Sequence, residues 1–246
     1  MSGYPAVYLP WARLKYPGPS PQVISSQTGL VIDGYTRSAT TFAVHAFQLS
    51  QEQPVRLAHH LHASAQLLTA ARRGVPALAL IREPRGAILS QLIREPKKEL
   101  RDALAAYSRF YIRLLPYRGS FVVGEFKEVT HDFGAVIRRL NAHFGTSFAE
   151  FVHTETNMRE CFDLIKLRGT GSPTLLGFES GTVSRDQLRR ELPALARRPM
   201  LDAEEAWIPS GNRERAKAAL DEQWRRPSLA RLRDRAAQAY QEFLAG

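Results

Sequence analysis

A loop between Gly34 and Thr41 carries the residue types that bind an oxyanion. Its polar side chains are Arg37, Ser38, Thr40 and Thr41. The apolar run at 30–33 predicts a buried strand before the loop, and an amphipathic pattern from residue 42 predicts a helix after it. The N-terminus of a helix attracts an anion, hydroxyls add donors, and a guanidinium matches the oxygens of phosphate or sulfate. The loop therefore predicts an anion site, although a plain capped turn uses the same residues.

The spacing of this loop differs from that of the P-loop in ATPases and kinases. The P-loop ends in Gly-Lys-Ser/Thr, and its lysine reaches the terminal phosphates of the nucleotide. If Thr40 takes the place of the Ser/Thr, Ala39 stands where that lysine is needed. Such enzymes also need carboxylates for Mg²⁺, and Asp33 is the one acid well placed beside the loop. An ATPase or kinase is therefore disfavoured, and a P-loop-type kinase or phosphotransferase is kept as the alternative enzyme.

A second candidate anion site runs from Arg82 to Ser90. Arg82 follows the apolar run at 77–81, and Pro84 begins a predicted helix that carries Ser90. An arginine at the end of a strand and a serine on the next helix can converge on one dianion if the turn between them folds back. The alternative interpretation is a capped helix start with an incidental serine.

Three histidines lie at the end of the predicted strand at 55–59 and just after it, namely His59, His60 and His62. The ordinary pKa of imidazole suits a general base near neutral pH. A metal site would need further ligands, and none is evident near this short stretch, so we expect no bound metal. A structural role, with the rings packed or hydrogen-bonded, is the other interpretation, and the residues alone do not decide which histidine would be the base.

The predicted elements alternate between strands and helices up to residue 145. Gly74 and Pro76 end a helix predicted from Ser64 to Arg73. Further predicted elements are a helix at 84–94, a helix at 97–115, a strand at 121–123, a helix at 133–144 and a C-terminal helix at 228–244. This alternation predicts an α/β fold with a parallel sheet flanked by helices on both faces. Ligands bind at the carboxyl ends of the strands in such sheets, where all three candidate sites lie.

Taken together, these motifs resemble those of sulfotransferases that use 3′-phosphoadenosine 5′-phosphosulfate (PAPS). The loop that binds the 5′-phosphosulfate in that family commonly ends Lys/Arg-Ser-Gly-Thr-Thr, and residues 37–41 match it except at Ala39. Because an alanine replaces the usual glycine, we expect residue 39 to avoid a positive φ. Arg82 and Ser90 match the family's motif for the 3′-phosphate in type and spacing. His60-Leu61 resembles the His-Leu pair that supplies the catalytic base.

The resemblance implies a P-loop-like, sulfotransferase-like nucleotide-binding fold and a role for each matched residue. His60 would take a proton from an acceptor hydroxyl or amine, and Arg37 would neutralise the charge that develops on the leaving phosphate. The residues implied to bind the donor are Arg37, Ser38, Ala39, Thr40, Thr41, Arg82 and Ser90. The implied cofactor is PAPS, which leaves as 3′-phosphoadenosine 5′-phosphate (PAP), and no metal is expected.

The resemblance is strong over 30–145 and weak elsewhere. In the segment 121–129, Phe126 stands where the family usually has tyrosine and Lys127 where it has glutamate. The late basic segment that grips the 3′-phosphate has two candidate counterparts, Arg168-Gly169 and the run 213–217. We expect one sulfotransferase-like domain over 1–246, with a proline-rich arm at 1–28, a cofactor-binding core at 30–145 and less certain substrate segments at 154–246.

Composition restricts the remaining classes. The chain has 246 residues, a net charge of +10 and one cysteine, Cys161, which excludes an internal disulfide and a multi-cysteine metal site. It contains no apolar stretch long enough for a membrane span and no signal sequence, so we expect a soluble, cytoplasmic protein. We expect a small-molecule, glycan or lipid acceptor and no nucleic-acid partner, and a non-catalytic binder of anions or nucleic acid is the third alternative. The sequence indicates neither the acceptor nor the oligomeric state.

Overall fold

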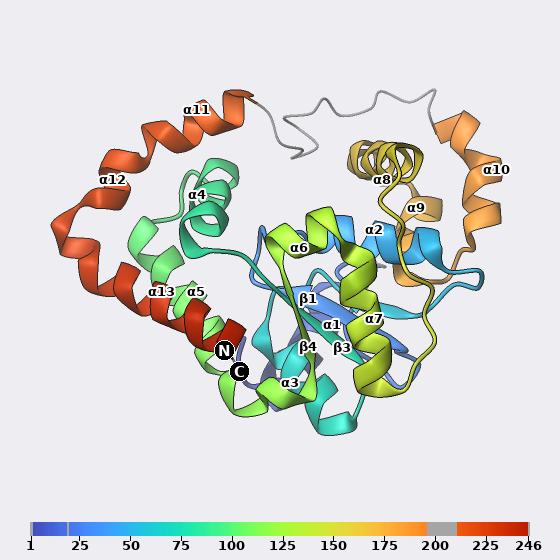
Figure 1. Ribbon diagram of the computed structural model, residues 1–246, viewed down its shortest axis with the longest axis horizontal. Helices are drawn as coiled ribbons and strands as arrows, with labels where there is room; N and C mark the ends of the chain where they lie inside the picture. Colours follow the sequence, from blue (N-terminus) through green and yellow to red (C-terminus); the bar gives the residue numbers. More distant parts are fainter. Residues whose placement is uncertain (1, 19, 196–210, 246) are drawn as a thin grey trace.

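The computed structural model describes residues 2–18, 20–195 and 211–245. Its centre is a four-stranded parallel sheet in the order β2-β1-β3-β4, visible in the middle of Figure 1. The strands are β1 (Leu30–Gly34), β2 (Leu57–His59), β3 (Ala77–Ile81) and β4 (Val122–Glu125). All five residues of β1 and of β3 are buried, because helices cover both faces of the sheet. The α/β fold class predicted from the sequence is confirmed.

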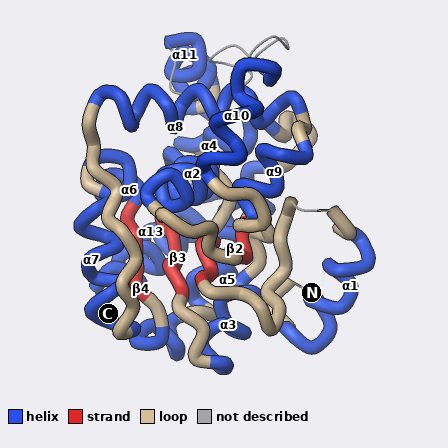
Figure 2. Tube along the Cα trace, turned by 90° about the vertical axis from the view of Figure 1, so that its right-hand side faces the viewer, coloured by secondary structure: helices blue, strands red, loops and turns tan. Residues whose placement is uncertain are grey.

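Alternate residues of each strand face two separate cores. Val31 and Ala79 belong to one core, and Ile32 and Leu78 belong to the other. The first core also contains residues of α1 (Pro5–Lys15), α3 (Ser64–Arg73), α4 (Pro84–Arg94), α5 (Leu100–Ile112) and α13 (Ala230–Ala245). The second contains residues of α2 (Thr40–Ser50), α7 (Phe133–Phe144), α8 (Glu155–Leu167), α9 (Pro173–Ser180) and α10 (Arg185–Leu195). Figure 2 shows the four strands between these two helical layers.

Helix ends agree well with the punctuation in the sequence. Gly74 and Gly145 end α3 and α7 in the left-handed conformation, with φ of 64° and 66°. Pro84 begins α4 at its first turn. The predicted helix at 97–115 is shorter in the structure, because the chain passes into a 3₁₀ helix at Leu115–Ser120, whose second residue is Pro116.

Two regions contain helices that the sequence did not predict. The proline-rich arm forms α1, in which Pro5 occupies the first helical turn, and this helix contacts α3. The segment after residue 154 contains α8, α9 and α10, together with the 3₁₀ helix η2 (Arg168–Thr170). The remaining short elements are α6 (Phe126–His131), α11 (Gly211–Ala219), α12 (Asp221–Arg225) and the 3₁₀ helix η3 (Pro227–Leu229).

The strand order places a topological switch point between β1 and β3. The chain passes from β1 to β2 on one side and then to β3 on the other side of β1. Such a reversal opens a crevice at the carboxyl ends of the two strands, where ligands of open α/β sheets bind. The residues that follow β1, β2 and β3 therefore meet at one edge of the sheet.

Candidate active site

The loop after β1 is tightly held and strained. A Cβ on Gly34 would lie 2.2 Å from the carbonyl oxygen of Leu80 on β3, so only glycine lets the two strands approach this closely. Arg37 and Ala39 both have φ of 69°, in the left-handed region. The expectation that residue 39 avoids a positive φ is therefore wrong. An alanine in this conformation costs about 1–2 kcal/mol, which the rest of the fold must offset.

Three of the predicted binding residues come together at the switch point. Arg37 Nε donates to Ser90 Oγ at 2.9 Å, which connects the β1 loop to helix α4. An Arg82 N–H group donates to the backbone oxygen of Arg37 at 3.3 Å, which connects the end of β3 to the same loop. The fold-back between Arg82 and Ser90 that the sequence required is present, and both residues lie beside Arg37.

Positive charge is concentrated around Arg37. Burial, followed by the charges of Arg94, Arg213 and Arg82, lowers the pKa of Arg37 to about 9. Burial also lowers the pKa of Arg82. Arginines that repel one another in a desolvated site are stabilised when an anion binds among them. The electrostatics of this corner therefore favour a ligand with more than one negative charge.

The hydroxyls of the loop lie at the start of α2. Ser38 and Thr40 are buried, and within the described part of the chain Thr40 Oγ1 has no hydrogen-bond partner. Ser38 lies beside the Tyr111 hydroxyl, but no well-aligned hydrogen bond joins the two. A buried hydroxyl without a partner is costly in a folded protein. An oxyanion bound to the loop would accept hydrogen bonds from these groups and from the first N–H groups of α2.

His60 lies beside this loop, and the other two histidines do not contact it in the same way. His60 Nε2 is 3.0 Å from Thr41 Oγ1. His62 is fixed by its own contacts, because its Nδ1 lies 2.9 Å from the Gly34 oxygen and its backbone N–H donates to Asp33. His59 is fully buried at the end of β2. Of the three histidines, His60 is the one that meets a hydroxyl of the predicted anion loop.

His59 and His60 are held in an uncharged state by their surroundings. Burial lowers the pKa of His59 to about 4, and the negative charge of Glu179 opposes that shift. Burial also lowers the pKa of His60 well below its usual value, and the positive charge of Arg168 adds to the effect. His60 and His62 have positive φ values of 59° and 50°. Four non-glycine residues with positive φ thus lie in the segments that follow β1 and β2, which is where strain often marks a functional site.

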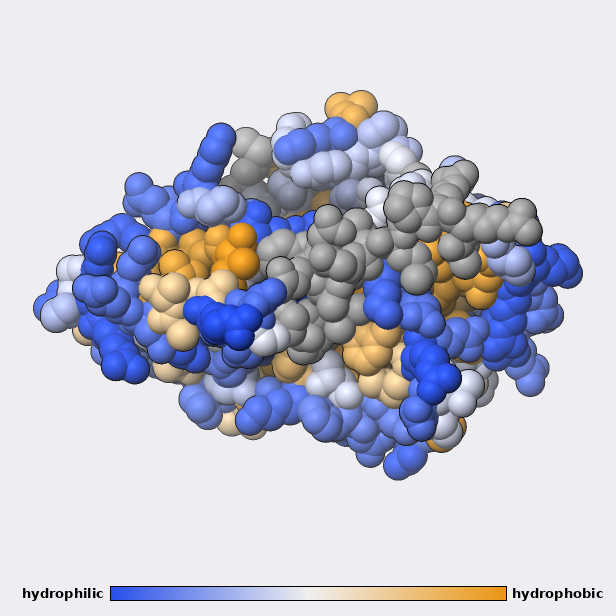
Figure 3. Space-filling model, turned by 90° about the horizontal axis from the view of Figure 1, so that it is seen from above, coloured by the Kyte–Doolittle hydropathy of each residue, from blue (hydrophilic) through white to orange (hydrophobic). Residues whose placement is uncertain are grey.

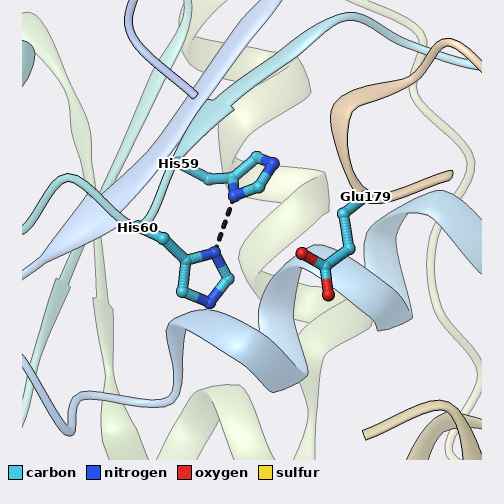
Figure 4. A group of neighbouring side chains, drawn as sticks. All are labelled: His59, His60 and Glu179. Atoms are coloured by element: carbon cyan, nitrogen blue, oxygen red, sulfur yellow. Dashed lines mark hydrogen bonds between the residues drawn. The ribbon is translucent and has the colours of Figure 1, made fainter. Parts of the chain in front are cut away.

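A buried carboxylate lies behind the histidines. Figure 4 shows His59, His60 and Glu179 together, with one nitrogen of each ring and one carboxylate oxygen all within 4.8 Å. Glu179 already receives a hydrogen bond from Arg168 Nε at 2.7 Å, and His45 Nε2 lies 2.9 Å from the same oxygen. The Nδ1 atoms of His59 and His60 are 2.6 Å apart and face each other. The two Nδ1 atoms and Glu179 Oε1 thus have hydrogen-bond partners in the protein, while His59 Nε2 and Glu179 Oε2 have none among the described residues.

Sequence reasoning missed several residues that hold the site in place. Tyr107 and Tyr111 on α5 donate to the backbone oxygens of Arg82 and Leu80 at 2.6 and 2.9 Å, and so fix the end of β3. Phe126 packs its ring against the Arg82 guanidinium, with 3.9 Å between that group and the ring centroid. The spacing of four between the two tyrosines was the available signal, since it places both on one helical face. Glu179 carried no such signal.

The two late basic segments have different surroundings. Arg168 bonds to Glu179 and to Ser20 Oγ, so its guanidinium is used inside the protein. Arg213, on α11, is buried and close enough to Arg37 to lower its pKa. Of the two candidates for a late phosphate contact, the structure brings Arg213 toward the predicted site.

Two of the clefts on the described part of the molecule adjoin helix α4. The larger, of about 750 Å³, lies between α4, the start of α5 and α11–α12, and none of the predicted site residues lines it. The smaller, of about 480 Å³, is lined by the loop residues Tyr35 and Thr36 together with His62, Arg109 and Arg113. Seen from above, hydrophilic residues form much of the outline of the molecule, and apolar residues gather in several separate areas between them (Figure 3). The smaller cleft is the one that adjoins the site.

Comparison with known proteins gives limited information. No protein-family model and no curated protein matches this sequence. Among solved structures, the chain is similar to mouse sulfotransferase SULT7A1 complexed with PAP, with 11% identity, a TM-score of 0.40, and coverage of 88% of this chain and 90% of that chain. A likeness of this extent assigns neither a family nor an activity. Within the described ranges, none of the helices has the length and apolar character needed to cross a membrane.

Proposed function

We propose that this protein is a sulfotransferase that takes a sulfuryl group from PAPS and passes it to a hydroxyl or amine of an acceptor. The observation that carries the proposal is the meeting of Arg37, Arg82 and Ser90 at the switch point, beside the N-terminus of α2. PAPS has two separate anionic groups, and the site has two groups of donors that suit them. The resemblance of both motifs to those of the sulfotransferase family supports the same assignment.

The site residues divide between the two ends of the donor. The loop residues bind the 5′-phosphosulfate, and they are Arg37, Ser38, Ala39 through its backbone, Thr40 and Thr41. Arg82 and Ser90 bind the 3′-phosphate. The unpartnered, buried Thr40 hydroxyl and the crowded arginines fit such a ligand, because each becomes more stable when an oxyanion is present.

The chemistry that PAPS supplies is a sulfuryl group whose bond to phosphate can break. His60 Nε2 accepts the proton of the acceptor, and it is ready to do so because the lowered pKa of His60 keeps the ring uncharged at neutral pH. Without an acceptor, the Thr41 hydroxyl occupies Nε2. Arg37 stabilises the negative charge that develops on the phosphate side. The roles of these residues do not require a metal.

The acceptor enters from the smaller cleft in this proposal. Thr36 of the anion loop and His62 line that cleft, and the centroid of the His62 ring lies 5.9 Å from that of His60. Its lining is rich in polar and charged side chains, including Gln91 and Arg109. The acceptor is therefore a small molecule, or the polar end of a glycan or lipid, that carries a hydroxyl or amine.

Thermal unfolding with PAP tests the donor site. A ligand at a hundredfold excess over its dissociation constant adds about 2.7 kcal/mol to the free energy of unfolding, which raises the midpoint by about 5–10 °C in a chain of this size. We expect this rise with PAP and no comparable rise with AMP or with ATP plus Mg²⁺. Arg82→Ala should abolish the rise. Arg85→Ala is the matched control, since Arg85 lies three residues further along the chain, on α4, is exposed and pairs with Asp221.

The same experiment separates the two alternatives. A P-loop-type kinase would respond to ATP plus Mg²⁺ and not to PAP, and that result would refute the sulfotransferase proposal. The surroundings of Asp33 disfavour a kinase. The Asp33 carboxylate accepts hydrogen bonds from Gly34 N, His62 N and Gln66 Nε2, so it is not open to Mg²⁺. No response to any nucleotide would favour a non-catalytic role of the basic surface, with a salt-sensitive macromolecular partner.

A further inference from the structure

The contact between His59 and His60 restricts where their protons can lie. The two Nδ1 atoms are 2.6 Å apart, so one of them must carry a hydrogen and the other must offer a lone pair. Both rings are uncharged near neutral pH, because burial lowers both pKa values. Each neutral ring carries a single N–H. The pair therefore exists in one of two arrangements that differ in every proton position.

Only one arrangement lets His60 act as a base. If His60 donates from Nδ1 to His59, its Nε2 is free to accept a proton, and the Thr41 hydroxyl donates to it. His59 then carries its hydrogen on Nε2. If His59 donates instead, His60 carries its hydrogen on Nε2 and has no lone pair facing the loop. Catalysis by His60 thus depends on the tautomer of His59.

Glu179 supplies the charge that distinguishes the two arrangements. Its side chain is fully buried, and Arg168 and His45 outweigh the effect of burial and hold its pKa at about 2, so it is ionised. Among the described residues, His59 Nε2 has no hydrogen-bond partner, and neither has Glu179 Oε2. The hydrogen between the two Nδ1 atoms is present in both arrangements, so they differ in whether the second hydrogen lies on Nε2 of His59 or on Nε2 of His60. Glu179 is the strongest charge acting on His59, whereas the charges that act most on His60 are positive and disfavour a hydrogen there. The carboxylate therefore favours the arrangement in which His60 Nε2 is free.

We propose that Glu179 is a positioning residue, which acts through His59 to keep His60 in the tautomer that accepts a proton. This inference rests on the proposed role of His60 as the base. Glu179 does not touch the reacting atoms. It determines which nitrogen of His59 carries the hydrogen, and His59 in turn determines which nitrogen of His60 carries it.

The fold holds Glu179 at a fixed place relative to β2. Gly181 ends α9 with φ of 74°, and a Cβ there would lie 1.9 Å from the Val55 oxygen, just before β2. Gln48 Nε2 donates to the backbone oxygen of Val55 at 2.8 Å and to the backbone oxygen of Glu179 at 3.4 Å. The backbone at the end of α9, which carries Glu179, is thus held close to the backbone just before β2, which carries His59.

Of the other charged groups around the pair, Arg168 and His45 also lower the pKa of His59, but each acts on it less than Glu179 does. Arg168, from η2, and His45, from α2, disfavour added positive charge on His60 and so keep it neutral. Asp33, from β1, raises the pKa of His59, as Glu179 does. His62, on the same segment, also disfavours a proton on His60. No charge acting on His59 thus outweighs Glu179 in placing a proton on that ring.

Nitrogen-15 NMR of the full chain tests the inference without any acceptor. Long-range proton–nitrogen correlations distinguish the two tautomers of each neutral histidine, with His59→Gln and His60→Asn spectra used for assignment. We expect His60 protonated at Nδ1 and His59 at Nε2. A hydrogen on Nε2 of His60 in the wild-type protein would overturn the inference.

Glu179→Gln should reverse both tautomers. The carboxamide removes the negative charge that favours the hydrogen on His59 Nε2, so that the hydrogen can lie on His60 Nε2 and be donated to Thr41 Oγ1. Release of PAP from PAPS, with water as the acceptor, should fall about 10-fold to 100-fold, while the affinity for PAP stays unchanged. Unchanged tautomers in this variant would overturn the inference.

Arg168→Gln is the matched control. It removes the same buried ion pair and keeps the carboxylate, so it should lower stability without reversing the tautomers. A reversal in Arg168→Gln would show that loss of the ion pair, and not of the charge on Glu179, controls the pair, and would overturn the inference. Failure of the sulfotransferase proposal would appear separately, as an absence of PAP binding in the wild-type protein.

Discussion

The ends of β1 and β3 and the end of β2 lie at the same edge of one sheet, yet their surroundings are opposite. Around Arg37, the charges of Arg82, Arg94 and Arg213 lie close together, and at least one buried hydroxyl lacks a partner among the described residues. Around His59 and His60, the buried charge of Glu179 is balanced by Arg168 and the rings stay neutral. In the proposed function, the first region binds an anionic donor and the second fixes the positions of protons. Donor binding and proton transfer are then separate tasks of separate strands.

Replacement of His60 should give the largest effect on turnover. Asparagine tolerates the positive φ of this residue, so His60→Asn should fold. Loss of the base should lower the rate of PAP release from PAPS about 100-fold to 10,000-fold, with unchanged affinity for PAP. His62→Asn is the matched control, because His62 also has a positive φ. A larger loss in His62→Asn than in His60→Asn would move the base to His62.

Replacement of Arg82 by lysine should affect only the first region, around Arg37 and Arg82. Lysine keeps the charge but loses the fork of two N–H groups, and hydrogen bonds to charged groups are worth about 1.5–3 kcal/mol. We expect Arg82→Lys to weaken PAP binding about 10-fold to 100-fold in a calorimetric titration. The tautomers of His59 and His60 should stay as in the wild-type protein. A change in the histidine spectra would show that the two regions are coupled.

The dependence of kcat/KM on pH should report the neutral state of His60. Burial places the pKa of His60 below its usual 6.5, so the free protein keeps an unprotonated base when the pH falls through that value. The acid limb of the profile should therefore lie below pH 6.5. If kcat/KM instead fell with an apparent pKa of 6.5 or above, His60 would be exposed to solvent and the region around His59 and His60 would not be buried as described.

The smallest expected effect is at Ala39. Glycine adopts φ of 69° without the steric cost that alanine bears, so Ala39→Gly should stabilise the protein by at most about 1 kcal/mol. That gain corresponds to a rise of about 2–4 °C in the midpoint of thermal unfolding. Destabilisation by more than 1 kcal/mol would show that the Ala39 methyl contributes more to packing than its strain costs.

The positions of the residues in the first region could be predicted from the sequence, whereas the buried carboxylate of the second could not, for physical reasons. Gly74, Pro84 and Gly145 act locally, so helix ends could be placed from the residues alone. Arg37, Arg82 and Ser90 could be joined because parallel strands end at one edge of a sheet. Glu179 meets His59 through a contact across 120 residues of chain, and no local pattern encodes such a contact. The strain at Ala39 also depends on tertiary contacts, which override the preference of alanine.

The separation of donor binding from proton transfer is tested most directly by a calorimetric titration with PAP. The titration compares the wild-type protein with His60→Asn and Arg82→Ala. The account predicts equal affinity in the wild-type protein and His60→Asn, and no detectable binding in Arg82→Ala. Equal binding by all three proteins, or loss of binding in His60→Asn alone, would contradict it.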